Sequence, residues 1–355
     1  MTPWTWLAPL AGVSILGAAI ALGTSPLIAW LAAFALVGSV FAAVHHAEVV
    51  AHRVGEPFGT LVLALAVTVI EASLILSMVI AGGAEQAAVP RDTIYAALMI
   101  ICNGVVGVCL LVGGWHHREQ SFRVEGANSG LAALMPMAAL TLVLPAFTIT
   151  TPGGTYSDSQ LIFAAVASLA LWAVFVFVQT VRHRDYFLPE EDPHDPNVHA
   201  EPPTTSEAWA SFGLLMVALV AVVGLAKVLS PSIERGVAAA GAPKAVIGIA
   251  IALIVLLPET WAAVRAARAN RLQTSMNLAI GSALASIGLT IPVVAIAAVV
   301  LQIPLVLGLD ALGIAMLVLT FLVSTVTLAT GRTHLMQGAV HLVIFAAFLF
   351  LALVP

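Results

Sequence analysis

The chain has 355 residues, of which 61% are hydrophobic and 9% are charged, and its formal net charge is −5. Its mean hydropathy is +1.07. Soluble domains carry roughly 25% charged residues, so this composition excludes a soluble globular protein and indicates a polytopic membrane protein. Most of the acidic excess lies in one loop, so the net charge says little about partners, and we expect no nucleic acid among them.

Apolar runs follow one another almost without interruption, and each has the length of about twenty residues that a helix needs to cross the hydrocarbon layer. Strands of a β-barrel would alternate over about ten residues, and these runs do not alternate. We therefore predict an all-α polytopic membrane protein. Its transmembrane helices, about eleven in number, are expected at residues 5–23, 26–45, 57–82, 93–113, 128–149, 158–181, 208–230, 243–267, 275–300, 303–328 and 335–354.

The beginning of the chain, MTPWTW, lacks the basic segment of a signal peptide, so we expect an uncleaved first helix with Trp4 and Trp6 at an interface. The positive-inside rule is satisfied when the N-terminus is cytoplasmic and the C-terminus external. We therefore predict a multi-pass protein of the inner membrane in that orientation. The basic residues that then lie at cytoplasmic ends or loops are Arg53, Arg118, Arg123, Arg182, Arg184, Arg265, Arg268, Arg271 and Arg332.

The longest polar segment is RHRDYFLPEEDPHDPNVHAEPPTTSE, residues 182–207, which contains five prolines and seven acidic residues. Such a composition predicts a flexible acidic linker, here on the cytoplasmic side. The linker divides the chain. We expect an extra N-terminal transmembrane helix at 1–25 and a first repeat at 26–181 before it, and a second repeat at 208–355 after it.

The two halves resemble each other around pairs of glutamates. Glu48 and Glu234 are each followed seven residues later by a Gly-X-Pro sequence and then by a long apolar run. That run contains Glu71 in the first half and Glu259 in the second. Five predicted crossings separate the copies, so one is inverted relative to the other. Inverted repeats are typical of secondary transporters, whose sites lie near the midplane of the bilayer.

Glu71 and Glu259 fall near the middle of their spans, where ionisable residues are usually functional. A buried ion pair is the structural alternative, but no Lys or Arg lies in the hydrophobic middle of any predicted span. Another alternative, one protonated glutamate bonded to a carbonyl, fits a single site but not a symmetric pair. Each carboxylate then has two stable forms, protonated or ionised with a bound cation, and we expect the pair to titrate as a coupled unit. A site of this kind exchanges protons for cations.

Oxygen-bearing side chains accompany both glutamates. Carboxylates, hydroxyls and carbonyls suit hard cations, and Ca²⁺ takes about 6–8 such ligands. Pro258 removes a backbone donor and should free a carbonyl one turn earlier. Each hydroxyl could instead bond its own helix. With Glu71 and Glu259 as the cation- and proton-binding pair, the candidate additional ligands are Thr68, Asn103, Thr260, Ser282 and Ser286, and the candidate entrance acids are Glu48 and Glu234.

Several longer blocks of the chain together resemble the calcium/cation antiporter superfamily, specifically the bacterial ChaA-like branch of the CAX-type Ca²⁺/H⁺ exchangers. Among them are AEVVAHRVGEPFGTLVLALAVTVIEASLI, PETWAAVRAARANRLQTSMNLAIGSALASIGLTIPV and GRTHLMQG. The resemblance implies two inverted repeats of five helices, preceded by one extra helix, with Glu71 and Glu259 as the binding pair. Exchangers of the better-known branch carry Gly-Asn before each glutamate, where this chain has Val67-Thr68 and Val255-Leu256. The missing amides suit looser ion selectivity.

We therefore expect a secondary active antiporter that exports Ca²⁺ from the cytoplasm in exchange for H⁺ by alternating access around the two glutamates. Na⁺(K⁺)/H⁺ exchange is the alternative, and a passive cation channel is a less favoured one. An intramembrane metalloprotease, suggested by HHAEVVAH (45–52), fails because a zinc helix needs two His four apart with Glu beside the first. We expect no enzymatic activity and no cofactor. The expected partners are the lipid bilayer, protons and the transported Ca²⁺, Na⁺ or K⁺. Stoichiometry, oligomeric state and any regulation by the ten histidines or the linker stay open.

Overall fold

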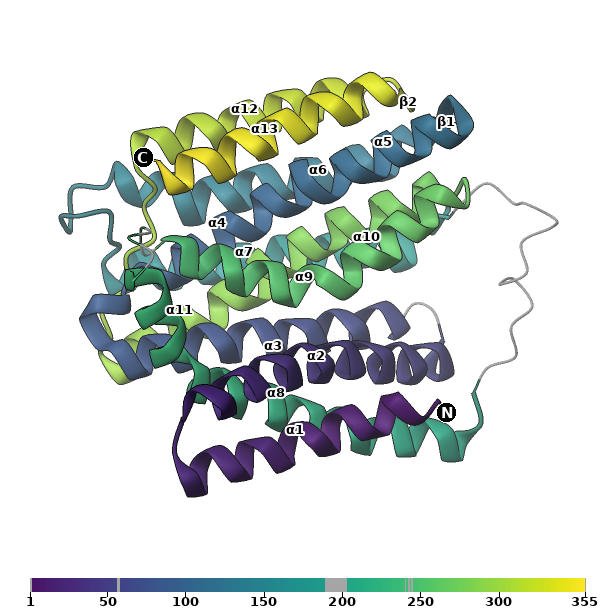
Figure 1. Ribbon diagram of the computed structural model, residues 1–355. Helices are drawn as coiled ribbons and strands as arrows, with labels where there is room; N and C mark the ends of the chain where they lie inside the picture. Colours follow the sequence, from purple (N-terminus) through teal and green to yellow (C-terminus); the bar gives the residue numbers. More distant parts are fainter. Residues whose placement is uncertain are drawn as a thin grey trace. The chain divides into compact units, whose positions relative to one another are not determined.

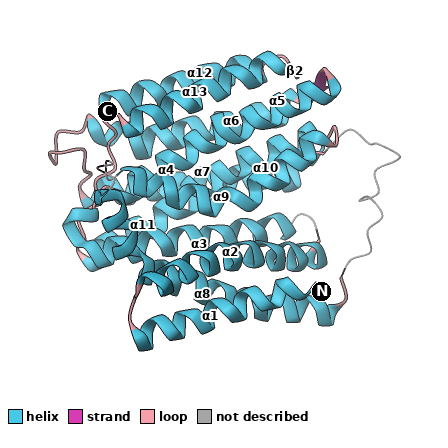
Figure 2. Cartoon of the chain, viewed as in Figure 1, coloured by secondary structure: helices cyan, strands magenta, loops and turns pink. Residues whose placement is uncertain are grey.

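The computed structural model describes residues 2–55, 58–188, 203–239, 241, 243 and 245–354. In these residues the chain is almost entirely helical, apart from two short strands (Figures 1 and 2). Ten helices of the described part are long and apolar enough to cross a membrane, and α3 (Phe58–Gly82) adds a shorter apolar stretch at Ala64–Ile80. The prediction of an all-α polytopic fold is confirmed, and each of the eleven predicted spans contains a helix.

Two compact units make up the chain. The first comprises Met1–Ala81 and Glu190–Ala240, and the second comprises Gly82–Pro189 and Gly241–Pro355. The helices of the first unit are α1 (Pro3–Leu22), α2 (Pro26–Val54), α3 and α8 (Thr205–Ala239). Helix α8, which follows the predicted linker, thus packs in the same unit as α1 and α2.

The extra first helix is a packed part of its unit. A Cβ atom added to Gly12 of α1 would collide with Ser39 of α2 and with Ala221 of α8. Near the start of α1, the carbonyl of Thr5 accepts a hydrogen bond of 2.9 Å from Nε2 of His46 on α2. Since only glycine fits at position 12, the three helices approach one another closely there.

The second unit holds the remaining elements. In chain order they are η1 (Gly83–Gln86), α4 (Val89–Met99), η2 (Ile100–Val105), α5 (Val106–His117), β1 (Glu119–Ser121), α6 (Val124–Ala138), η3 (Ala139–Val143), η4 (Leu144–Ala146), α7 (Asp158–Phe177), η5 (Val178–Arg182), η6 (Arg184–Tyr186), α9 (Ala245–Arg268), α10 (Leu272–Ala285), η7 (Ser286–Thr290), α11 (Ile291–Leu301), α12 (Ala311–Leu328), β2 (Arg332–His334) and α13 (Leu335–Leu353).

Helices α5 and α13 are in close backbone contact. The antiparallel pair of β1 and β2 brings the end of α5 beside the start of α13. Cβ atoms added to Gly114 and Gly338 would collide with the backbone of Leu335 and Leu111, respectively. Glycine at these two positions therefore lets the last helix lie directly on α5, with α12 beside it (Figure 1).

The described residues contain four π-helical segments, η2, η3, η5 and η7, and two of these lie at corresponding places in the two halves. Segment η2 lies between α4 and α5, and η7 lies between α10 and α11. Each follows the glutamate-bearing helix of its half, which is α3 with Glu71 or α9 with Glu259. Such turns are frequent at functional sites. Nothing in the sequence analysis predicted them.

The span predicted at 303–328 begins too early, because residues 303–310 are not helical and α12 begins at Ala311. Pro304 disfavours the helical conformation of the residue before it. The helix starts where Asp310 can cap it, with its Oδ1 accepting a hydrogen bond of 2.7 Å from the amide of Gly313.

The non-helical segment 303–310 has its own hydrogen-bond partners. Its amides donate to carbonyls of earlier loops and turns, at 2.8 to 3.0 Å. The pairs are Val306 with Ala87, Gly308 with Gly154, and Leu309 with Leu142. The segment therefore ties together several connections at one end of the second unit.

The predicted acidic linker lies largely outside the described residues, which omit 189–202. Its final residues already belong to α8, which starts at Thr205. Thr204 and Glu207 form a reciprocal cap there. The amide of Thr204 donates to Glu207 Oε2 at 2.9 Å, and the amide of Glu207 donates to Thr204 Oγ1 at 3.3 Å.

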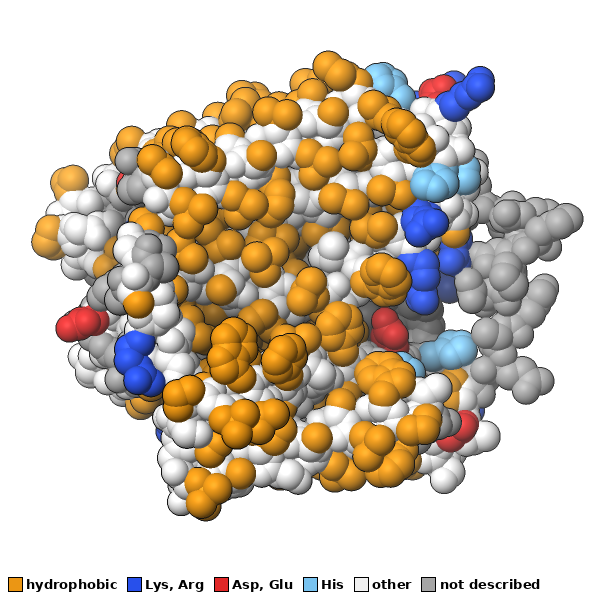
Figure 3. Space-filling view, in the orientation of Figure 1, with side chains coloured by type: hydrophobic (Ala, Val, Ile, Leu, Met, Phe, Trp, Pro, Cys, Tyr) orange, Lys and Arg blue, Asp and Glu red, His pale blue; other side chains and the backbone are white. Residues whose placement is uncertain are grey.

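The exposed surface of the helices is rich in large apolar side chains. Trp30, Phe163 and Leu322 are 68%, 65% and 61% exposed, and apolar side chains cover much of the face seen in Figure 3. Extensive exposed apolar surface marks contact with a membrane. With the ten apolar helices, this surface identifies a multi-pass membrane protein.

Candidate cation site

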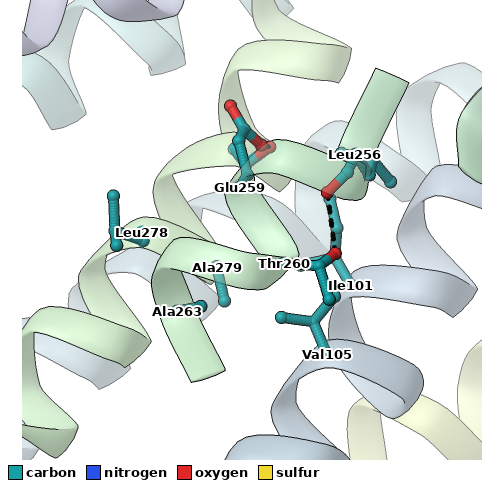
Figure 4. Close-up of a pocket in the computed structure, with 9 residues that line it drawn as sticks. Ile101, Val105, Leu256, Glu259, Thr260, Ala263, Leu278 and Ala279 are labelled. Atoms are coloured by element: carbon teal, nitrogen blue, oxygen red, sulfur yellow. Dashed lines mark hydrogen bonds between the residues drawn. The ribbon is translucent and has the colours of Figure 1, made fainter. Parts of the chain in front are cut away.

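A small pocket in the second unit surrounds Glu259. Its volume is about 10 Å³, which is close to the space that one water molecule needs. Three elements supply its walls, namely η2, α9 and α10. The lining residues are Ile101, Val105, Leu256, Glu259, Thr260, Ala263, Leu278, Ala279 and Ser282 (Figure 4). The pocket can therefore hold one ligand of the size of a bare ion.

Ser282 of α10 donates a hydrogen bond to Oε2 of Glu259 on α9. Both residues were predicted for the site, and the structure brings them together. A hydroxyl that donates to a carboxylate also presents two lone pairs. The same oxygen can thus support the ionised glutamate or ligate a cation bound to it.

Thr260 lines the pocket, but its hydroxyl is engaged in its own helix. Its Oγ1 donates to the carbonyl of Leu256 at 2.7 Å, as the dashed line in Figure 4 shows. Pro258 lies inside α9 and carries no amide hydrogen, so the carbonyl of Ile254 loses its usual helical donor. Pro258 thus leaves one backbone oxygen of α9 without its helical hydrogen bond, one turn before the proline.

Glu71 lies on the buried face of α3. It is 3% exposed, and Thr68, one turn earlier, is 5% exposed, whereas Leu65 and Val69 are 51% and 44% exposed. The helix thus turns its carboxylate away from lipid and towards protein. Glu71 and Thr68 belong to the first unit, and Glu259 and Ser282 to the second.

Asn103 lies in the middle of η2 and is fully buried. Its amide nitrogen donates to Thr320 Oγ1 at 2.9 Å, and its amide oxygen lies 3.3 Å from Nδ1 of His341. Ile101 and Val105 of the same segment line the Glu259 pocket, whereas Asn103 does not. The structure therefore places this candidate ligand among side chains of α12 and α13.

The partners of Asn103 were not predicted from the sequence. Thr320, Ser324 and Thr327 are all buried on α12, at the spacing of one helix face. Such a stripe of hydroxyls in an apolar span could have been recognised from the sequence. His341 was one of ten histidines for which no individual role was predicted, and it is 1% exposed.

The remaining predicted residues are Ser286, Glu48 and Glu234. Ser286 is buried at the start of η7, one turn after Ser282. Glu48 is exposed on α2. Glu234 lies in α8, and its side chain is outside the described residues.

Comparison with known sequences gives a consistent result. The family described as "Sodium/calcium exchanger protein" matches residues 24–181 and 210–354. The protein y4hA of Sinorhizobium fredii, named for ionic transport, is 48% identical over 99% of this chain and 96% of its own length. The sodium-potassium/proton antiporter ChaA of Escherichia coli is 36% identical over 92% of this chain and 89% of its own.

Solved structures share the fold at low identity. The structure of native YfkE matches with a TM-score of 0.76 at 16% identity, covering 99% of this chain and 100% of YfkE. The H⁺/Ca²⁺ exchanger CAX matches with a TM-score of 0.73 at 16% identity, over 98% of this chain and 88% of its own.

Proposed function

The chain belongs to the sodium/calcium exchanger protein family, and on that premise we propose that it is a secondary active antiporter exporting Ca²⁺ from the cytoplasm in exchange for H⁺. Transport proceeds by alternating access around Glu71 and Glu259. The observation that carries the proposal is the hydrogen bond from Ser282 to Glu259 in a pocket of the size of one ion.

The chemistry of that pocket supports exchange rather than simple binding. An isolated ionised carboxylate in an apolar environment is very unstable, so Glu259 must be compensated whenever water is excluded. A proton and a cation are alternative compensating ligands for the same oxygen atoms. Because the pocket holds about one ion, the two compete, and release of one requires arrival of the other.

The oxygen donors favour a hard cation. Glu259 and the Ser282 hydroxyl supply oxygen only, as Glu71 and Thr68 do on α3. Two carboxylates together balance the charge of Ca²⁺, whereas one Na⁺ would leave the second carboxylate in need of a proton.

Exchange of Na⁺ or K⁺ for H⁺ is the second candidate, and one observation favours it. The relative that is 36% identical is named a sodium-potassium/proton antiporter, whereas the Aphanothece halophytica relative named a Ca²⁺/H⁺ antiporter is 23% identical. In addition, position 68 carries Thr and position 256 carries Leu, so neither offers an amide oxygen.

An inner-membrane location with a cytoplasmic N-terminus belongs to the same proposal. In the second unit, basic helix ends gather at one end, where His117 Nε2 bonds the carbonyl of Arg268 at 2.9 Å and β2 brings Arg332 beside β1. Arg91 lies near the start of α4, where its guanidinium donates to the carbonyl of Gly308. Under the positive-inside rule, the end rich in arginine faces the cytoplasm.

Ion flux in proteoliposomes with an imposed pH gradient tests the proposal, with Ca²⁺, Na⁺ and K⁺ assayed in parallel. We expect Ca²⁺ to accumulate against its gradient and to reverse direction when the pH gradient is reversed. Flux that follows the cation gradient whatever the pH gradient would identify a channel. Proton flux driven by Na⁺ or K⁺, with Ca²⁺ neither driving nor inhibiting it, would select the second candidate.

A further inference from the structure

Four buried polar side chains form a continuous chain of hydrogen bonds behind the cation pocket. Asn103 bonds Thr320 at 2.9 Å and His341 at 3.3 Å, and His341 Nε2 lies 3.0 Å from Thr327 Oγ1. None of the four is more than 3% exposed. These hydrogen bonds connect η2 with α12 and α13, all within the second unit.

The direction of each hydrogen bond follows from its neighbours. The hydroxyl of Thr320 donates to the carbonyl of Met316 at 2.8 Å, so its oxygen accepts from the amide nitrogen of Asn103. The amide oxygen of Asn103 then faces His341, whose Nδ1 must donate to it. The other ring nitrogen, Nε2, accepts from the hydroxyl of Thr327. The three hydrogen bonds of the network are thus compatible with one another in a single arrangement.

These hydrogen bonds are made on one side of the π-helical turn η2, and the opposite side of η2 forms part of the Glu259 pocket. Ile101 and Val105 are one α-helical turn apart and line the Glu259 pocket, whereas Asn103, midway between them, projects to the opposite side. A π-helical turn is unusual in a regular helix and needs tertiary support. A shift of η2 by a few tenths of an ångström would matter in a cavity of about 10 Å³.

Helix α13 also packs tightly on this segment at the level of His341. A Cβ atom added to Gly107 would lie 3.1 Å from Cβ of His341 and 3.0 Å from Cγ of Leu342. One added to Gly104 would lie 3.3 Å from the ring of Phe345. The histidine therefore cannot withdraw from Asn103 unless the helices separate.

We infer that His341 is a positioning residue for cation binding, which acts by donating a hydrogen bond to Asn103 and so fixing η2 against the Glu259 pocket. The role rests on the proposed function, because it assumes that the cation binds beside Glu259. In this role Asn103 holds the backbone of η2 in position and does not itself bind the cation.

His341→Asn and His341→Gln test the hydrogen bond to Asn103 and the hydrogen bond to Thr327 separately. The amide nitrogen of asparagine can replace Nδ1 of histidine, whereas that of glutamine reaches the place of Nε2. We expect His341→Gln and His341→Leu to raise the apparent KM for the cation about tenfold, as loss of a buried hydrogen bond would. The maximal rate should stay within about twofold, and His341→Asn should remain close to the wild type. Thr141→Val is the matched control, because Thr141 is fully buried and its hydroxyl donates to Met137, away from η2.

A second measurement does not depend on transport. Cys102 lies in η2, is 7% exposed and is a free thiol. In a Cys109→Ser background it becomes the single cysteine. Alkylation of Cys102 by N-ethylmaleimide should be about tenfold faster in His341→Leu than in the wild type or Thr141→Val, and His341→Asn should restore the slow rate.

The two measurements together decide the matter. Equal alkylation rates and equal KM values in His341→Leu and Thr141→Val would overturn the inference. So would a His341→Asn variant as impaired as His341→Leu, because side-chain volume would then be the cause. If the wild type proves to exchange no cation for protons, the proposed function fails, whereas the alkylation rates still report whether His341 fixes η2.

Discussion

Ser282 hydrogen-bonds Glu259 from a neighbouring helix, 23 positions further along the chain. The contact fixes α10 against α9 at the level of the carboxylate. It also places a hydroxyl where a cation bound to the glutamate would find a second oxygen ligand.

Substitution of either central glutamate by glutamine should abolish exchange. The amide resembles the protonated carboxyl but cannot ionise, so Glu71→Gln and Glu259→Gln should reduce coupled flux in proteoliposomes to the level of protein-free liposomes. Glu125→Gln is the control, because Glu125 is exposed in the first turn of α6 and should behave as the wild type. Near-normal exchange by either central variant would contradict the mechanism.

Removal of the Ser282 hydroxyl should weaken cation binding without eliminating it. Ser282→Ala loses a hydrogen bond to a carboxylate and a candidate ligand oxygen, so the apparent KM should rise about tenfold. Ser129→Ala removes a hydroxyl that bonds only the backbone of its own helix, to the carbonyl of Glu125, and should not change the KM. A KM that is equal in the two variants would leave Ser282 without a role in binding.

Ion selectivity should respond to an amide beside Glu71. Thr68 is buried one turn before Glu71, so Thr68→Asn adds a side-chain amide oxygen on the same face of α3 as this glutamate. We expect the ratio of Ca²⁺ to Na⁺ transport to rise about fivefold, because Ca²⁺ gains more than Na⁺ from an added oxygen ligand. Thr68→Val keeps the side-chain size but offers no oxygen, and it should not raise the ratio. An unchanged ratio in Thr68→Asn would place residue 68 outside the coordination sphere.

Glu48 gives a prediction about access rather than binding chemistry. The residue is exposed on α2, where a carboxylate could attract cations to an entrance. Glu48→Ala should raise the apparent KM more than it lowers the maximal rate, and high ionic strength should reduce the difference from the wild type. Superimposable saturation curves at low ionic strength would reduce Glu48 to a structural residue.

The contact between α5 and α13 can be tested with a pair of glycines. Gly338→Ala puts a methyl group against the backbone of Leu111 and should destabilise the protein by about 1–3 kcal/mol. Gly213→Ala on α8 meets nothing within 4 Å and should be neutral or stabilising by up to about 1 kcal/mol. Thermal unfolding in detergent measures both. Equal shifts for the two variants would show that α13 does not depend on this close approach.

The sequence was sufficient to predict what depends on average hydrophobicity and on isolated charges. Each of the eleven spans was predicted because a run of apolar residues is required wherever a helix crosses lipid. Glu259 and Ser282 were predicted because polar side chains are costly within an apolar span and are usually functional there. The non-helical segment 303–310 was not predicted because most of its residues are as apolar as those of a helix. Pro304 and the capping residue Asp310, rather than hydropathy, decide its conformation.

The roles of Asn103 and His341 could not have been predicted from either residue alone. In the sequence, Asn103 is a polar residue in an apolar span, as Ser282 is. Whether Asn103 or Ser282 faces the pocket depends on which side of its helix packs against the neighbouring helices. The π-helical turn of η2 alters the direction in which successive side chains point, so this side cannot be read from the regular helical spacing. Such a turn depends on contacts with α12 and α13, which lie far along the chain.

The segment 303–310 has a consequence for how the protein is made. Its amides are the donors for the carbonyls of Ala87, Leu142 and Gly154, which leave the ribosome much earlier. Strand β1 is likewise synthesised before its partner β2, and α5 before its partner α13. The first helices of the second unit therefore enter the membrane before their permanent partners exist, and water or the insertion machinery must satisfy their polar groups meanwhile. Completion of this unit therefore requires α13 to have been synthesised.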